Sequence, residues 1–132
     1  MKRNVLFILF LFILFLPRCL FADSPLSEPV QNPDVPYRLY RTTNMWTFIK
    51  LDTRDGKMWQ LQFDIEGEER FTVTLNDTPL VEPNFRRQGR FTLYPTSNIF
   101  TFILLDQLDG RTWQVQWSMK KKERFVIPIE EL

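Results

Sequence analysis

Apolar and polar positions alternate in short runs over residues 37–129, which is the pattern of β-strands. The pattern occurs twice, because residues 48–63 (FIKLDTRDGKMWQLQF) return 54 positions later as residues 102–117 (FILLDQLDGRTWQVQW). At this constant offset the similarity continues without a gap from 39–71 to 93–125. A gap-free duplication indicates that the two copies share their strands and loop lengths.

Each copy contains four runs that predict strands. In copy order they cover 37–41 and 91–94, 45–52 and 99–106, 57–63 and 111–117, and 71–75 and 125–129. The loops TRDG and QLDG turn the second strand into the third, and their glycines suit a positive φ beside a bulge. One copy is too small to close a core. We therefore predict an all-β fold, in which the tandem four-stranded antiparallel units form one pseudo-two-fold sandwich or a partly open barrel.

The third strand of each copy alternates between large apolar residues and glutamines. We therefore place Trp59 and Trp113 in the core. The glutamines on the other side would form either a solvated outer face or a polar row able to hydrogen-bond a sugar or a peptide edge. The members of this row are Gln60, Gln62, Gln114 and Gln116.

The second strand is apolar on both faces, with Trp46 and Phe48 on one side and Ile49 and Leu51 on the other. A strand of this kind is usually covered on both sides. Whatever the two halves leave uncovered would be an interface or a binding surface. We therefore take Trp46 and Phe48 as candidate binding residues, together with the glutamine row.

The N-terminus has the pattern of a secretory signal. Lys2 and Arg3 precede an unbroken apolar run over 5–16, which is too short to span a bilayer, and Ala22 is a suitable residue before a cleavage point. We expect 1–22 to be a signal peptide. The protein would then be exported to the periplasm or the extracellular space.

Cys19 offers an alternative, since its acylation would make an outer-membrane lipoprotein; this lipid would be the expected membrane contact. Arg18 argues against it, because a small residue usually precedes such a cysteine. After the signal, 23–36 reads as a proline-rich tether. The β repeats then cover 37–76 and 91–132 and are joined by a connecting loop at 77–90.

Charge and composition exclude several function classes. The chain has 17 Lys and Arg, 16 Asp and Glu, and no histidine. Removal of 1–22 takes Lys2, Arg3 and Arg18, so the 17 basic residues less these three leave 14 against 16 acidic ones, a net charge of −2. This balance does not favour nucleic acid as a partner. Without histidine or Cys19 there is no disulfide, no Cys or His zinc site, and no imidazole-based triad, and we expect no cofactor.

Two sets of charged residues stand out in the loops. Asp52, Asp55, Asp106 and Asp109 flank the hairpin turns and could suggest a calcium loop or an acid-base pair, but aspartate before glycine is common turn chemistry. The loop at 64–69 (DIEGEE) is acidic, whereas its counterpart at 118–123 (SMKKKE) is basic. These loops could pair within one molecule, pair head to tail between molecules, or remain solvated.

The repeated motif resembles two groups of proteins. L-D-x-x-x-G-x-x-W, at 51–59 and 105–113, resembles the hairpin of repeated blades in β-propellers, particularly quinoprotein-like ones, although two copies cannot close a propeller unless chains combine. Over nearly all of 38–129 the chain resembles small exported proteins of gut-type Bacteroidetes bacteria. These carry N-[MI]-[WFY]-x-F-[LI]-x-L-D-[TQ]-x-x-G-[KR]-x-W-Q-[VL]-Q-[WF], matched here at 44–63 and 98–117 with Leu108 replacing a polar loop residue. Their function is unassigned, so the resemblance implies export and fold class but no activity.

The sequence thus predicts an exported protein that binds a partner and has no catalytic role. The expected partner is an envelope or extracellular protein, contacted through the apolar face of the second strand or the charged loops. The alternative is a glycan-binding module that uses Trp46 and the glutamine row. A hydrolase is the third hypothesis, and it requires the aspartates to converge in one cleft.

Overall fold

The computed structural model describes residues 30–132, of which Gln31–Leu132 form one compact unit. The expected signal peptide, Cys19 and the first part of the tether lie outside the described residues. The elements are β1 (Tyr37–Arg41), β2 (Thr47–Asp52), β3 (Met58–Gln62), β4 (Phe71–Asn76), a 3-10 turn (Pro83–Phe85), β5 (Phe91–Pro95), β6 (Thr101–Asp106), β7 (Thr112–Gln116), a 3-10 turn (Lys121–Glu123) and β8 (Phe125–Ile129). Within 30–132, no helix has the length and apolar character needed to cross a membrane.

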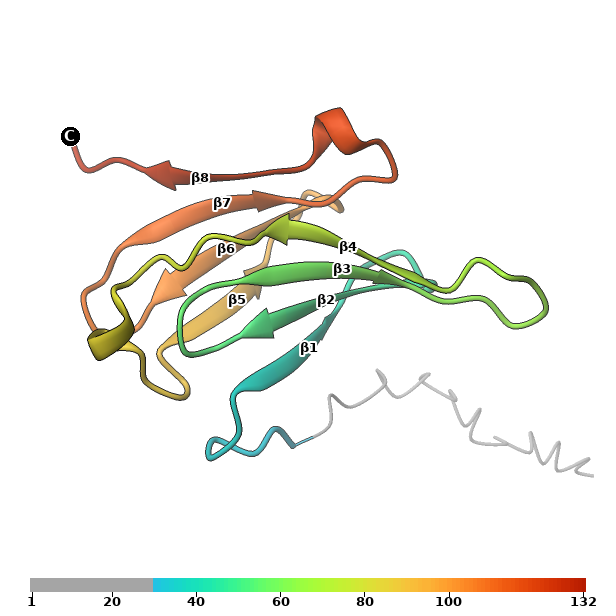
Figure 1. The fold of residues 1–132 in the computed structure, drawn as a ribbon. Coiled ribbons are helices and arrows are strands. Elements are labelled where there is room, and N and C mark those ends of the chain that lie inside the picture. Colours follow the sequence, from blue (N-terminus) through green and yellow to red (C-terminus); the bar gives the residue numbers. More distant parts are fainter. Residues whose placement is uncertain (1–29) are drawn as a thin grey trace, which may run out of the picture. The chain divides into compact units, whose positions relative to one another are not determined.

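The strands form two separate antiparallel sheets, β1-β2-β3-β4 and β5-β6-β7-β8 (Figure 1). The predicted all-β fold and its tandem duplication are thereby confirmed. The second strands begin two residues later than predicted, because a repeated turn precedes them. In the first copy, Thr42 Oγ1 donates to the carbonyls of Asn44 and Thr47 at 3.0 and 2.9 Å, while Asn44 Oδ1 accepts from Trp46 N at 2.9 Å. Thr96 and Asn98 build the same turn before β6.

The Asp-Gly hairpins have the predicted geometry. Gly56 and Gly110 have φ of 81° and 83°, a left-handed conformation that glycine adopts without strain. Each glycine N–H donates to the aspartate carbonyl four residues earlier, at 3.0 Å for Gly56 and 2.9 Å for Gly110. The hairpins therefore fix the register of β2 with β3 and of β6 with β7 in the same way.

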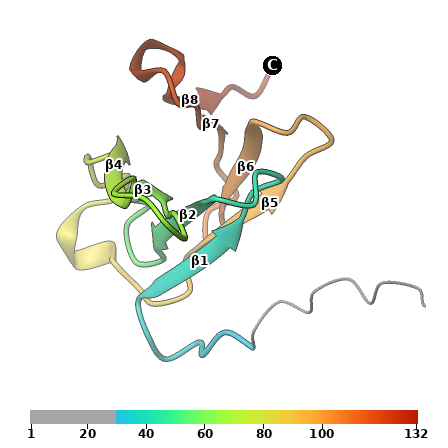
Figure 2. The same cartoon turned by 90° about the vertical axis from the view of Figure 1, so that its right-hand side faces the viewer.

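The two sheets pack face to face around one apolar core, as two layers that Figure 2 shows side by side. The inner face of the first sheet contributes Ile49, Leu51 and Met58, and that of the second contributes Phe91, Leu93, Phe102, Leu104, Trp113, Val115 and Trp117. Full burial of one such side chain stabilises the fold by about 1.5–3 kcal/mol.

The two inner faces are not equivalent, so the copies are not related by the expected two-fold axis. Ile49 is fully buried, but its counterpart Ile103 is only partly buried; conversely Phe102 is buried and its counterpart Phe48 is partly exposed. Because adjacent strand positions point to opposite faces, this difference means that opposite faces of the repeat meet in the core. The second sheet is stacked on the first head to tail, with a free face at each end.

The connecting segment 77–90 fastens this stack. Phe91 N donates to Thr53 O at 2.8 Å and Gly89 N donates to Thr53 Oγ1 at 3.0 Å, which ties the start of β5 to the β2–β3 hairpin. Leu80 N donates to Asp55 O at 2.8 Å, and the Leu80 side chain packs against Gly56 so closely that a Cβ would not fit there. The first hairpin is thus covered by the chain that leads to the second sheet.

Alanine variants of counterpart residues test the head-to-tail stacking. In dilute solution we expect Ile49→Ala to lower the free energy of unfolding by about 2–5 kcal/mol, and Ile103→Ala by less than half of that, since only Ile49 leaves a closed cavity. On the other face of the repeat the second copy should be the more sensitive one, so Phe102→Ala should lower the free energy of unfolding more than Phe48→Ala. Urea unfolding measures all four, and equal losses within each pair would contradict the stacking.

Candidate binding surface

The outer face of the first sheet carries mostly apolar residues, with Arg41 and Lys50 among them, and the second sheet does not cover it. We call it the first-sheet outer face: Tyr37, Leu39, Arg41, Phe48, Lys50, Trp59, Leu61 and Phe63. Three of these residues are largely exposed, with 51% of Tyr37, 48% of Leu39 and 40% of Phe63 accessible. Large apolar side chains so exposed, and adjacent to one another, mark an interaction surface more often than isolated ones do.

Aromatic rings meet at one end of this face. The Trp46 and Phe63 rings lie edge to face with centroids 5.4 Å apart, and the Phe48 and Phe63 centroids are 6.1 Å apart. The Arg41 guanidinium lies 5.7 Å from the Phe48 centroid. Phe48, Phe63, Leu39, Leu61, Arg70 and Phe71 line a hollow of about 460 Å³ here. Of the predicted binding residues, Trp46 and Phe48 are therefore brought together with Phe63 at a partly exposed apolar site.

At the other end of the same face, a lysine covers two aromatic rings. Lys50 Nζ lies 4.7 Å from the Trp59 centroid and 5.9 Å from the Tyr37 centroid, a cation–π arrangement. Trp59 was predicted to be a core residue; it is only partly buried and lies on the outer face, whereas its counterpart Trp113 is in the core. The error has a physical reason, because the same alternation serves opposite faces in the two copies.

The second sheet also has a free face, of which the sequence singled out only the two glutamines Gln114 and Gln116. The second-sheet outer face comprises Tyr94, Ile103, Leu105, Gln114, Gln116, Ile127 and Ile129. Tyr94 and Ile127 are about half exposed, at 50% and 48%. The alternating apolar residues of 125–129 were the available signal, but β8 could equally have turned them inward.

The four glutamines do not form one row. Gln60 is fully buried between the sheets, with Nε2 3.7 Å from Met119 Sδ and no hydrogen-bond partner for Oε1 among the described residues. Gln62 accepts a 2.8 Å hydrogen bond from Thr47 Oγ1. Gln114 and Gln116 lie on the second-sheet outer face, where Gln116 Nε2 donates to Glu123 O at 3.2 Å. The predicted common polar surface is thus divided by the core.

Arginines neutralise the hairpin aspartates. In the first copy, Arg54 binds both carboxylate oxygens of Asp52 at 2.9 and 2.8 Å, and Arg86 lies 2.8 Å from Asp55. The buried Asp106 receives Arg90 through Nε and Nη2, the shortest contact being 2.7 Å. Each aspartate also accepts a backbone N–H of its own turn. These carboxylates stabilise turns and ion pairs and do not converge as a free acid and base.

Arginine contacts also shift the titration of these groups. Burial raises the pKa of Asp52, but the hydrogen bonds from Arg54 and the charges of Arg54 and Arg86 outweigh it, so the pKa lies below its ordinary value. The pKa of Asp109 is also lowered, because burial raises it by less than the hydrogen bonds from Arg111 lower it. Both carboxylates are therefore ionised at neutral pH.

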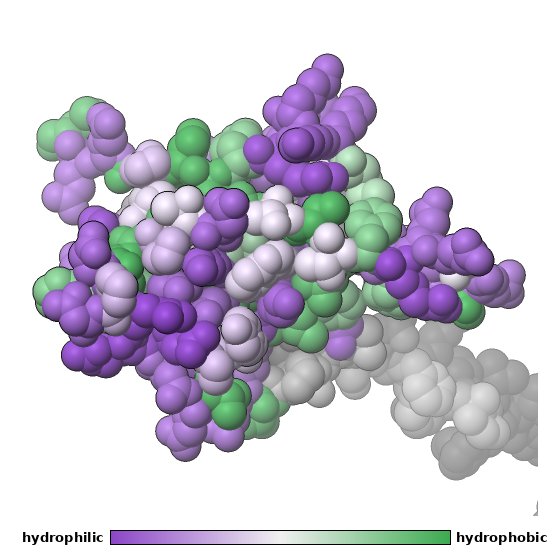
Figure 3. All heavy atoms as spheres, viewed as in Figure 1, coloured by the Kyte–Doolittle hydropathy of each residue, from purple (hydrophilic) through white to green (hydrophobic). Residues whose placement is uncertain are grey.

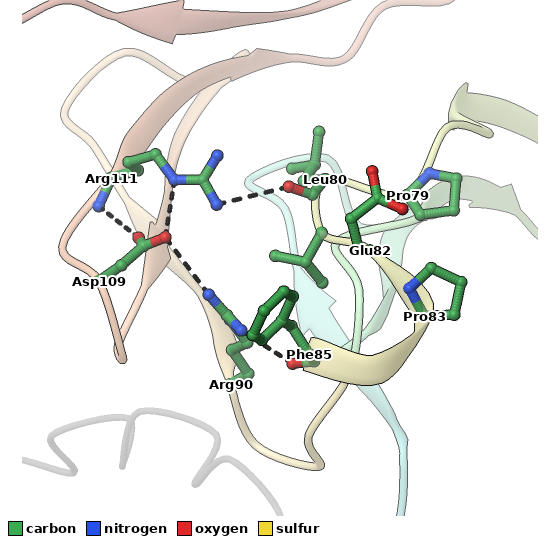
Figure 4. Close-up of a pocket in the computed structure, with 9 residues that line it drawn as sticks. Pro79, Leu80, Glu82, Pro83, Phe85, Arg90, Asp109 and Arg111 are labelled. Carbon is green, nitrogen blue, oxygen red and sulfur yellow. Dashed lines mark hydrogen bonds and ion pairs between the residues drawn. The ribbon is translucent and has the colours of Figure 1, made fainter.

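A second hollow, of about 640 Å³, lies between the connecting segment and the β6–β7 hairpin (Figure 4). Three of its charged side chains are already engaged: Asp109 Oδ2 is 3.3 Å from Arg90 Nη2 and 2.8 Å from Arg111 Nε, and Arg90 Nη1 donates to Phe85 O at 2.8 Å. In residues 30–132, no group of three or more Asp, Glu, His or Cys could hold a metal ion. The arginines around this hollow therefore join the connecting segment to the β6–β7 hairpin.

The charged loops make hydrogen bonds within themselves. Arg70 donates to the carbonyls of Gly67 and Ile65 at 3.0 and 3.3 Å, and its counterpart Arg124 donates to those of Ser118 and Met119 at 2.6 and 3.0 Å. Both loops project as polar tips with apolar residues between them (Figure 3). Their opposite charges are thus held outward, where they could meet a partner.

The ion pairs of Asp52 predict the acid stability of the protein. A carboxyl with a lowered folded pKa stabilises fully above its unfolded pKa of about 3.9, and this stabilisation is lost as the pH falls toward the folded pKa. Because the chain has no histidine, we expect a level free energy of unfolding from about pH 8 to 5 and a decline below about pH 4.

Asp52→Asn should lower stability at pH 7 by about 1–3 kcal/mol and flatten the acid decline. Asp34→Asn, on an exposed carboxyl, is the matched control and should change neither. Urea unfolding across this pH range gives the answer. An acid slope in Asp52→Asn equal to that of the wild type would contradict the role given to Asp52.

Comparisons with known proteins do not indicate a function for this chain. No family model, curated protein or solved structure matches the chain. The resemblance to exported Bacteroidetes-type repeat proteins thus stays a prediction, as does export itself. The structure shows two sheet faces that no other part of the described chain covers. It also shows that arginines pair with the hairpin aspartates.

Proposed function

We propose that this protein is a non-catalytic binding protein whose binding surface is the first-sheet outer face, and that its partner is a protein presenting an apolar β-sheet face. One observation carries the proposal. The counterparts of these residues in the second sheet form the buried side of the core: Phe91, Leu93, Phe102, Trp113, Val115 and Trp117 stand in for Tyr37, Leu39, Phe48, Trp59, Leu61 and Phe63. The repeat thus uses this face for packing against another sheet.

The composition of the face supports a protein partner. Tyr37, Phe48, Trp59 and Phe63 supply large rings, and Arg41 lies at the edge. Tyr, Trp and Arg are the residue types that most often dominate protein interfaces, because they bury much area with few rotatable bonds. The surface also spans β1, β2 and β3, which suits a sheet better than a small molecule.

The state of the aspartates supports a non-catalytic role. Asp52 and Asp106 are buried and paired with arginine, so neither of these two carboxylates is free to exchange a proton with a substrate. The proposed setting is the periplasm or the extracellular space, which follows from the signal-like pattern of 1–22. An envelope or extracellular protein is therefore the expected class of partner.

Photo-crosslinking tests the binding surface. With benzoylphenylalanine at position 39 or 63 in the producing cell, we expect a covalent adduct that mass spectrometry identifies as a protein. The same probe at Phe85, which is 56% exposed but lies on neither outer face, should give none. An adduct pattern that does not distinguish 39 and 63 from 85, or a complete lack of adducts, would refute the proposal.

A glycan-binding module is the second candidate, favoured by the partly exposed Trp46 ring beside Phe63. The burial of Gln60 counts against it, because the polar row that would orient a sugar is divided. We expect a glycan array to give no signal. Sugar binding that Trp46→Ala abolishes while the circular dichroism spectrum is unchanged would instead establish the glycan module.

A further inference from the structure

We propose that the partner of the first-sheet outer face is the second-sheet outer face of another copy of this chain, so that chains stack head to tail. This inference rests on the proposed function and names its partner. Its basis is the core itself, which already shows how one face of the repeat packs on the opposite face of the next.

The two free faces repeat the chemistry of the two packed faces. The inner face of the first sheet and the second-sheet outer face occupy the same side of the repeat. Their counterparts are Tyr40 and Tyr94, Ile49 and Ile103, Leu51 and Leu105, Gln60 and Gln114, and Val73 and Ile127. A second chain would therefore meet a surface of nearly the same shape and polarity as the one buried inside each chain.

One exposed hydrogen bond between the two sheets has a counterpart that could form between chains. Thr43 Oγ1 donates to Ile99 O at 3.4 Å between the two sheets. Shifted by 54 residues, this contact joins the hydroxyl of Ser97 in one chain to Met45 O in the next. The hydroxyl is therefore retained where the stacked arrangement requires a donor.

The connecting segment gives an independent argument. Its residues 77–83, DTPLVEP, repeat residues 23–29, DSPLSEP, at the same offset of 54. In the first copy, Leu80 of this segment covers Gly56 in the hairpin turn. The counterpart turn is open, since no atom lies within 4 Å of the position where a Cβ on Gly110 would stand. The turn at Gly110 is therefore left without the cover that Leu80 gives to the turn at Gly56.

The charges of the loops alternate in the proposed stack. The loop at 64–69 has four acidic residues, and the loop at 118–123 has three lysines and one glutamate. Head-to-tail stacking makes acidic and basic loops alternate along the stack, which is already their order within one chain. Opposite charges in register favour this orientation over a two-fold pairing of like loops.

One substitution makes the contact between chains weaker than the contact within a chain. The buried Leu104 has Lys50 as its counterpart, and the Lys50 ammonium lies over Trp59 on the free face. A lysine stem can pack on apolar surface only if its charged end reaches water. The stack should therefore form reversibly and depend on chain concentration.

A head-to-tail contact either closes into a ring or continues as a filament. Opposite-face stacking of four-stranded sheets is the arrangement of propeller blades, which close at about four to eight blades. Because each chain supplies two sheets, closed rings would contain about two, three or four chains. This number follows from the angle between sheets, and sedimentation analysis measures it.

Complementary blocking variants test the stack. Leu39→Glu blocks the first-sheet outer face, and Ile127→Glu blocks the second-sheet outer face; both side chains are 48% exposed on edge strands, so neither change disturbs the core. We expect the wild type to assemble with rising concentration and each variant alone to self-associate about tenfold more weakly or not at all. An equimolar mixture of the two should form a dimer, because one intact contact remains.

Phe85→Glu, outside both faces, is the control and should assemble like the wild type. The stack is overturned if the wild type stays monomeric, if either variant assembles normally, or if the mixture does not pair. Crosslinking from position 63 separates the two proposals. An adduct with β6–β8 of a second copy supports both, an adduct with a foreign protein refutes the stack alone, and no adduct refutes both.

Discussion

A sheet that is apolar on both sides needs two neighbours, and a chain with two such sheets can supply only one neighbour to each. This constraint shapes the protein. Ile49 and Leu51 on one side of β2 are covered by the second sheet, while Phe48 on the other side lies beside Phe63 and Arg41 of its own sheet. One face of each sheet is buried in the core. The other face of each sheet remains exposed, at the two ends of the stack.

Stacking by opposite faces places the same residue type in two different environments. Trp113 is enclosed in the core, whereas Trp59 lies under the Lys50 ammonium at the surface. Gln60 is buried beside Met119, whereas Gln114 lies on the outer face. A duplicated sequence is therefore not a duplicated surface. Some differences between the copies, such as Lys50 for Leu104, fall where one copy is partly exposed and the other is enclosed.

The charged residues serve this stack. Arg86, from the connecting segment, pairs with Asp55 in the hairpin of the first sheet, and Arg90 binds Asp106 in that of the second. Burial of a carboxylate is tolerated here because a guanidinium and a turn N–H satisfy it. Each hairpin is thereby held by an arginine of the connecting segment. All four hairpin aspartates take part in turn hydrogen bonds and ion pairs.

The strands, the Asp-Gly hairpins and the tandem duplication were determined by the sequence, because alternation, glycine conformation and turn hydrogen bonds are local properties of a few residues. The face that each sheet buries was decided only by tertiary structure. Alternation in 58–62 fixes that Trp59 and Gln60 point apart, but it does not say which one points inward. That choice depends on where the neighbouring sheet lies, and it left Trp59 partly exposed, Gln60 enclosed and two apolar faces free.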